Sequence, residues 1–160
     1  MTIADDVVAL RSFPRRYREK VAGVRGDDAW DRLVRRVAPG QRRSALGWVV
    51  HATEALGALA DAVASLPTQA HPSLALAAIA GAPSEPPATA TVDEVLAGLV
   101  TSATRAADAV EARSAADWDR EIAVDGRPRP ARDVLDTIVQ AVARHLRDVD
   151  TAVEAARAER

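Results

Sequence analysis

The chain has 160 residues, of which 48% are hydrophobic, 28% are charged and only 3% are aromatic. Its 21 basic and 23 acidic residues give a net charge of −2, which offers no reason to expect a nucleic acid or an anionic membrane as partner. It has no cysteine, so disulfides, thiolate metal sites and cysteine nucleophiles are excluded for this chain. The length is enough for one domain with a core of Ala, Val and Leu, which suits close helix packing.

The first ten residues, MTIADDVVAL, include two aspartates and lack the basic start of a signal peptide. No segment approaches the roughly 18 consecutive apolar residues that indicate a membrane-spanning helix. We therefore expect a cytoplasmic protein with no membrane partner.

Helical periodicity predicts a first helix over 13–24, with Pro14 in the first turn, where its missing N–H costs nothing. Residues 4–11 form a separate turn or an extension of this helix. A short helix is predicted over 27–37, with Asp27 as its N-cap.

The second long helix is predicted over 44–66, because its apolar residues fall on one arc at 100° per residue. Arg43 and Glu54 belong to the polar stripe opposite. His51 falls at the border between the two faces. The next segment, 67–90, contains five of the nine prolines and is predicted to be mostly loop, with room for a short helix over 71–81.

The third long helix is predicted to start at a capping box formed by Thr91 and Glu94 and to end near residue 113. A turn or short helix follows at 114–118. Residues 121–131 are predicted to be a connection with an Asp-Gly turn.

The fourth long helix is predicted over 131–158, with His145 well inside its core face. Four amphipathic helices without strand alternation predict an all-α fold, an up-and-down four-helix bundle in a single domain over 1–160. Small bundles often cover residual apolar surface with a second copy, so a homodimer is one possible assembly.

Four segments of the chain contain motifs similar to those of a known protein superfamily. They read FPRRYREKVAGV (13–24), APGQRRSALGWVVHATEAL (38–56), AADWDREI (115–122) and ARDVLDTIVQAVARHLRDVDTAV (131–153). In order and spacing they resemble the DinB/YfiT-like superfamily, whose members show W-S-A-x-E-x-x-x-H-x-x-D, a D-W-x-R turn and a closing H-x-x-H-H-L-x-D-I. That superfamily includes metal-dependent thiol S-transferases and the N-terminal domain of mycothiol-dependent maleylpyruvate isomerases.

The resemblance implies a DinB-like bundle with a metal held by three histidines. His51 and His145 match two of these ligands, and Ala141 stands at the third position. Arg43 and Gly47 replace the motif's tryptophan and glutamate. An intact site would imply thiol transfer or isomerisation, with the metal lowering the pKa of a bound thiol or water.

Two imidazoles alone are too few for a Zn²⁺ or Ni²⁺ site, which takes three or more protein ligands. Glu54, Asp148 or His71 could supply another ligand. Without one, we expect no resident metal. His145 would then be a buried neutral imidazole, and His51 would pair with Glu54.

A metal-free alternative keeps a pocket between the second and fourth long helices, lined by Trp48 and Arg144. There His51, assisted by Glu54, would act as a general base, and Arg144 would hold a carboxylate. The resemblance thus implies a DinB-like enzyme of transferase or isomerase type that modifies a small molecule. The alternative is a non-catalytic, metal-free ligand-binding or interaction protein.

Overall fold

The computed structural model describes residues 2–23, 27–75 and 85–158. The protein is mostly helical, at 69%, and within the described ranges six helices pack together beside a small three-stranded sheet. The helices are α1 (Ile3–Val21), α2 (Asp28–Arg35), α3 (Ala45–Ser65), α5 (Val92–Glu111), α6 (Ala115–Trp118) and α7 (Ala131–Ala158), and the strands are β1 (Ser73–Leu74), β2 (Glu121–Val124) and β3 (Arg127–Pro130). In the described part of the chain, no helix is both long enough and apolar enough to cross a membrane.

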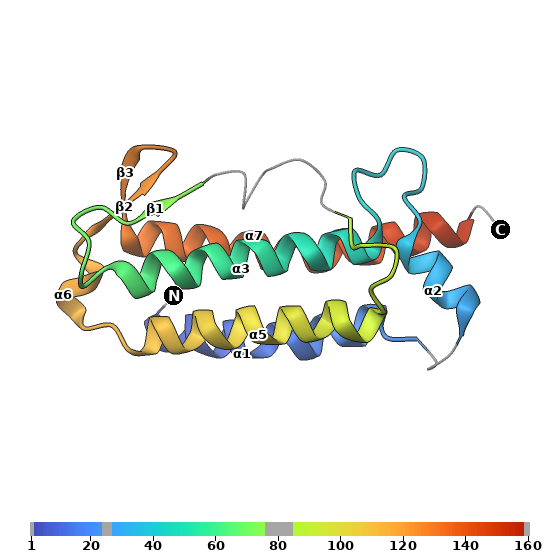
Figure 1. Ribbon diagram of the computed structural model, residues 1–160, viewed down its shortest axis with the longest axis horizontal. Coiled ribbons are helices and arrows are strands. Elements are labelled where there is room, and N and C mark those ends of the chain that lie inside the picture. Colours follow the sequence, from blue (N-terminus) through green and yellow to red (C-terminus); the bar gives the residue numbers. More distant parts are fainter. Residues whose placement is uncertain (1, 24–26, 76–84, 159–160) are drawn as a thin grey trace.

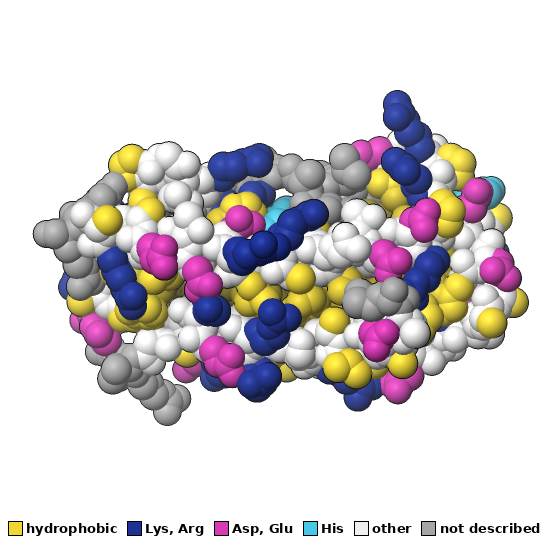
Figure 2. Space-filling view, turned by 180° about the vertical axis from the view of Figure 1, so that it is seen from behind, with side chains coloured by type: hydrophobic (Ala, Val, Ile, Leu, Met, Phe, Trp, Pro, Cys, Tyr) yellow, Lys and Arg dark blue, Asp and Glu magenta, His cyan; other side chains and the backbone are white. Residues whose placement is uncertain are grey.

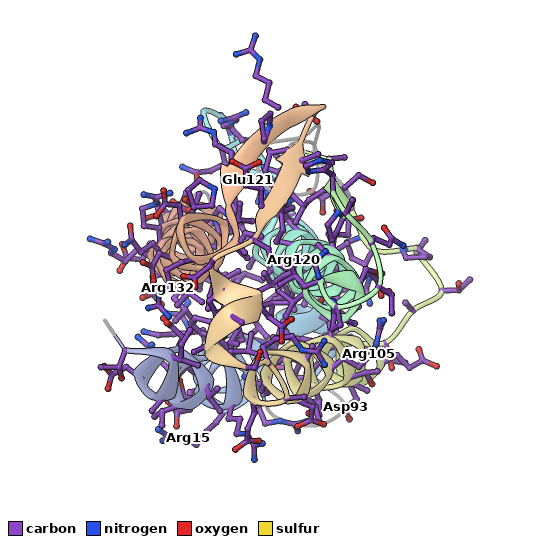
Figure 3. All side chains as sticks on the ribbon, turned by 90° about the vertical axis from the view of Figure 1, so that its left-hand side faces the viewer. Arg15, Asp93, Arg105, Arg120, Glu121 and Arg132 are labelled. Carbon is purple, nitrogen blue, oxygen red and sulfur yellow. The ribbon has the colours of Figure 1, made fainter. Side chains whose placement is uncertain are left out.

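The four long helices form two layers, with α3 beside α7 and α1 beside α5 (Figure 1). Seen end-on, they occupy the corners of a square, and the β2–β3 hairpin lies above α3 and α7 (Figure 3). The core between them consists largely of buried Ala, Val and Leu, as the composition predicts. Polar contacts also cross this core; for example, the Tyr17 hydroxyl donates to the Val142 carbonyl oxygen at 2.8 Å.

The helix directions differ from those of the predicted up-and-down bundle. Ser44, before α3, contacts Glu85, which precedes α5, and Asp61 of α3 pairs with Arg105 of α5. These contacts show that α3 and α5 run parallel, although they are consecutive long helices. The prediction is wrong because the connection before α5 brings the chain back to the start of α3, as long crossover connections do in other bundles.

α1 starts ten residues earlier than predicted and contains Pro14 in its interior. The start is fixed by a capping box in which Thr2 and Asp5 satisfy each other's backbone N–H groups. Pro14 lacks the N–H that would bond to the carbonyl of Leu10. The helix nevertheless continues, because one buried apolar stripe runs along its whole length, made of Val7, Leu10, Phe13, Tyr17 and Val21.

Several predicted element ends are confirmed. Asp27 caps α2 by accepting hydrogen bonds from Ala29 N and Trp30 N. The capping box of Thr91 and Glu94 starts α5. α3 and α7 occupy the predicted ranges within one residue at each end.

The small sheet was not predicted. β1 stands where a helix over 71–81 was expected, and residues 76–81 of that expectation lie outside the described residues. β2 and β3 form a hairpin across the Asp-Gly turn, whose residues Asp125 and Gly126 have φ of 48° and 76°. Such positive angles define the tight hairpin turn that an Asp-Gly pair favours. The prolines of β3 fit its position at the sheet edge, where no N–H is needed.

Replacing Pro14 by alanine restores a backbone N–H to the middle of α1. We expect Pro14→Ala to raise the free energy of unfolding by about 1–2 kcal/mol, since the regained helix hydrogen bond outweighs the extra entropy of the unfolded chain. Chemical denaturation checks this. A lower stability than that of the unmodified protein would contradict it.

Candidate active site between α3 and α7

Four side chains at the interface of α3 and α7 form what we call the histidine cluster: Arg43, Trp48, His51 and His145. Ser44 starts α3, and its hydroxyl oxygen accepts a hydrogen bond from Gly47 N at 2.9 Å. Trp48 and His51 follow three residues apart, so they share one face of the helix. α7 runs antiparallel to α3 and brings His145 opposite that face.

The rings of the cluster contact each other directly. The His145 ring is stacked on Trp48, with centroids 4.8 Å apart and planes at 29°. The His51 ring lies 5.0 Å from that of His145, and the Arg43 guanidinium lies 4.7 Å from the centre of the Trp48 ring. The structure therefore brings together the two histidines that the sequence singled out, 94 positions apart.

Burial in the cluster is deeper than the helical wheel suggested. His51 is 1% exposed and Arg43 2%, although the wheel placed His51 at the border and Arg43 on the polar stripe. His145, expected deep in the core, keeps 12% of its side chain exposed. Arg43 precedes the first turn of α3, so the wheel does not apply to it. Arg144, expected in the pocket, is exposed on α7.

Each histidine faces a carboxylate three residues later in its own helix. Asp148 Oδ2 lies 3.0 Å from His145 Nδ1, within hydrogen-bond distance. Glu54 Oε2 lies 3.9 Å from His51 Nδ1, which is an ion-pair distance but too long for a hydrogen bond. Among the described residues, the other ring nitrogen of His145, Nε2, is buried and has no hydrogen-bond partner.

The surroundings of His145 favour its neutral form, chiefly through burial. Burial lowers the pKa of His145 below its usual 6.5, and the nearby His51 and Arg43 lower it further, while Asp148 raises it in part. Burial also lowers the pKa of Arg43, which stays charged because an arginine pKa starts so high. A neutral His145 that donates its Nδ1 proton to Asp148 has a free lone pair at Nε2. That nitrogen can accept a proton or bind a metal.

The described residues do not fit a three-ligand metal site. No group of three or more His, Cys, Asp or Glu side chains in the described part of the chain is placed to hold a metal ion. Ala141 is buried and offers no ligand, and Asp148 is bound to His145 Nδ1. His71 is exposed beside β1. Neither the three-histidine set of the resemblance nor a substitute third ligand is therefore assembled here.

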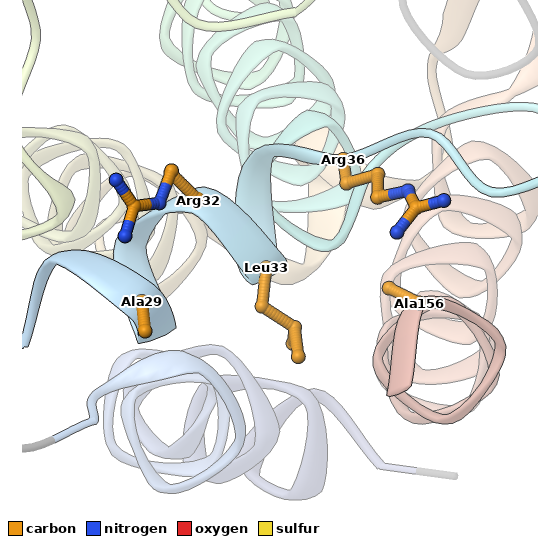
Figure 4. A pocket seen from close by; sticks show the side chains of 5 residues that line it. All are labelled: Ala29, Arg32, Leu33, Arg36 and Ala156. Atoms are coloured by element: carbon orange, nitrogen blue, oxygen red, sulfur yellow. The ribbon is translucent and has the colours of Figure 1, made fainter. Parts of the chain in front are cut away.

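In Figure 2 histidine surface is visible near the middle of the face, beside basic side chains, and again at one edge. A separate pocket of about 220 Å³ lies between α2 and α7 (Figure 4). Its Arg32 and Arg36 point to opposite sides of Leu33, so their guanidinium groups do not converge on one ligand position. A second pocket, of about 470 Å³, lies between α1 and α7 and is lined by Arg16 and Lys20 among others.

Sequence reasoning missed two residues of this region. Arg43 was assigned to the surface, although its position directly before the N-cap Ser44 could have signalled a place at the helix end. Glu85 accepts hydrogen bonds from the backbone and hydroxyl of Ser44, and nothing in its proline-rich surroundings signals this long-range contact.

Comparisons with protein-family models, with curated proteins and with solved structures found no match for this chain. The resemblance to the DinB/YfiT-like superfamily therefore rests on the sequence motifs alone.

The lowered pKa of His145 predicts how stability depends on pH. Between the folded and unfolded pKa values, the unfolded chain binds more protons than the folded one. We therefore expect the free energy of unfolding to decrease as the pH falls below about 6.5 and through the folded pKa of His145. Denaturation curves between pH 8 and pH 5 on a roughly half-unit grid would measure this.

The matched control for this prediction is His145→Asn, which keeps a donor for Asp148 but does not titrate. Its stability should vary less with pH over the same range. An equally steep decrease in the variant would show that His145 is not responsible.

Proposed function

We propose that the protein is a DinB-like helical-bundle enzyme that acts on a small molecule at the histidine cluster by acid–base chemistry, without a resident metal. The observation that carries this proposal is the hydrogen bond between His145 Nδ1 and Asp148, together with the unpartnered Nε2 of the same ring. A carboxylate that fixes the tautomer of a buried imidazole is the arrangement found in histidine general bases.

The roles of the residues follow from their geometry. Asp148 accepts the Nδ1 proton and orients the ring, so that His145 Nε2 can remove a proton from a bound substrate. The positive charge of Arg43, buried within the same cluster, would stabilise negative charge that develops on the substrate. This assignment moves the base from His51 to His145, because the contact of His51 with Glu54 is longer.

The reaction class follows from what such a base can do. A proton taken from an acidic carbon and returned by the same imidazole to another carbon isomerises the substrate. A proton taken from a bound thiol leaves a thiolate, which forms a bond to an electrophilic carbon of a second substrate while that carbon's bond to its leaving group breaks and the imidazolium protonates the leaving group. These are the two activities that the family resemblance implies. A small-molecule substrate or ligand, a possible homodimer and a cytoplasmic location are predictions from the sequence.

A second candidate function is a non-catalytic binding or interaction protein. It is favoured by the burial of Arg43, Trp48 and His51, each at most 8% exposed, which is also how a polar core cluster packs. In that case the stacked rings would stabilise the α3–α7 interface and do no chemistry.

The test combines ligand screening with metal analysis. A small-molecule library that includes thiols and carboxylates is screened by NMR shifts of the His145 ring, and each hit is tested for conversion. We expect His145→Asn to reduce turnover of a converted hit by roughly 100-fold or more, the usual contribution of a general base. Binding without any conversion would favour the second function.

The metal content of protein purified without an affinity tag is measured by elemental mass spectrometry. We expect no stoichiometric Zn²⁺ or Ni²⁺, and no shift of the His145 ring signals on adding Zn²⁺. Stoichiometric metal that is lost in His145→Asn would contradict the metal-free mechanism.

A further inference from the structure

The start of α3 holds the carboxylate of a residue 41 positions further along the chain. Ser44 N donates to Glu85 Oε1 at 2.9 Å, and the Ser44 hydroxyl donates to Glu85 Oε2. Ser44 is fully buried, so both oxygens of Glu85 bind a residue that water cannot reach. The contact joins the end of the long connection to the first turn of α3.

Gly47 provides the space for this carboxylate. A Cβ atom built on Gly47 would lie 2.4 Å from Glu85 Oε1, closer than real Cβ atoms come to other atoms. An alanine at position 47 would therefore push Glu85 away. The glycine and the glutamate depend on each other, although 38 positions separate them in the sequence.

The negative charge of Glu85 is also favourable at the start of α3. The N-terminus of a helix favours a negative charge, because its first N–H groups point outward. Arg43 is the neighbour of Ser44 in the chain, and the negative charge of Glu85 raises the pKa of Arg43 against the effect of burial. Contacts then lead from Arg43 to Trp48 and from Trp48 to His145.

We propose that Glu85 is a positioning residue of the histidine cluster: by clamping the first turn of α3, it keeps Arg43 buried over Trp48. The proposal concerns the site of the proposed function and rests on that function for its catalytic meaning. The effect of Glu85 on the position of Arg43 can be tested without measuring turnover. Without the clamp, Arg43 moves away from the rings, and the cluster becomes more accessible to water.

A simpler role would be helix capping alone, which affects stability and leaves the cluster unchanged. The chain contains a matched control for this role. At the start of α5, Glu94 accepts hydrogen bonds from Thr91 N at 2.7 Å and from the Thr91 hydroxyl at 3.0 Å. The donors are equivalent, but Glu85 is among the groups that shift the pKa of Arg43, whereas Glu94 is not.

The experiment compares Glu85→Gln with Glu94→Gln. The first readout is the pKa of His145 from an NMR titration. The second is acrylamide quenching of Trp48 fluorescence in a Trp30→Phe, Trp118→Phe background. We expect Glu85→Gln to raise the pKa of His145, because Arg43 no longer lowers it and water solvates the ring. Quenching of Trp48 should increase. Glu94→Gln should change neither readout.

Gly47→Ala serves as the second variant, since it displaces Glu85 without removing its charge. It should raise the pKa of His145 in the same direction. An unchanged pKa in both Glu85→Gln and Gly47→Ala would overturn the proposal and leave capping as the only role. A lowered pKa in Glu85→Gln would overturn it as well, because Glu85 would then act on His145 directly through its charge.

These outcomes distinguish the positioning role of Glu85 from the proposed catalytic role of His145. If His145→Asn has no effect on turnover but Glu85→Gln raises the pKa of His145, the clamp stands and the catalytic proposal fails. If His145→Asn abolishes turnover but Glu85→Gln leaves the cluster unchanged, the reverse holds.

Discussion

The stacking of Trp48 against His145 joins α3 to α7, and the cluster depends on this contact. Trp48 has Arg43 over its ring and the imidazole of His145 stacked on it at 4.8 Å, so one indole orders a cation and a base. Removing a charged guanidinium from water is unfavourable unless other interactions compensate. The aromatic contact and the nearby carboxylates of Glu54, Glu85 and Asp148 supply that compensation.

The chain direction makes this contact possible. Because α3 and α7 are antiparallel, residues near the start of α3 meet the second half of α7. The crossover before α5 then returns the chain to the same end of the bundle, where Glu85 reaches Ser44. The start of α3 thus combines a helix N-terminus, a buried arginine and a distant carboxylate. The bundle core, made of small and branched aliphatic residues, supplies the rigid support.

Much of the fold could be predicted from the sequence. Helical periodicity and caps such as Asp27 and Thr91 are local signals, and they located the helices well. The start of α1 was missed because Pro14 is a strong local signal for a first turn, whereas the apolar stripe that overrides it spans the whole helix. The β2–β3 hairpin was missed because two four-residue strands with two prolines show no clear alternation.

The site was only partly predictable for a similar reason. His51 and His145 stood out as rare residues on helical faces, and the structure places them together. A helical wheel describes a single helix and contains no information on packing between helices. It therefore cannot show which histidine is more deeply buried or which arginine packs beside them. Glu85 could not be foreseen at all, since its partner lies 41 positions away.

The proposed role of His145 is tested most directly by its protonation state at pH 7, read from long-range ¹H–¹⁵N NMR spectra of the imidazole. We expect a neutral ring with the proton on Nδ1, donated to Asp148, and no proton on Nε2. In Asp148→Asn the pKa of His145 should fall, because the carboxylate that raises it is gone. A ring that is cationic at pH 7, or that carries its proton on Nε2, would contradict the assignment of His145 Nε2 as the general base.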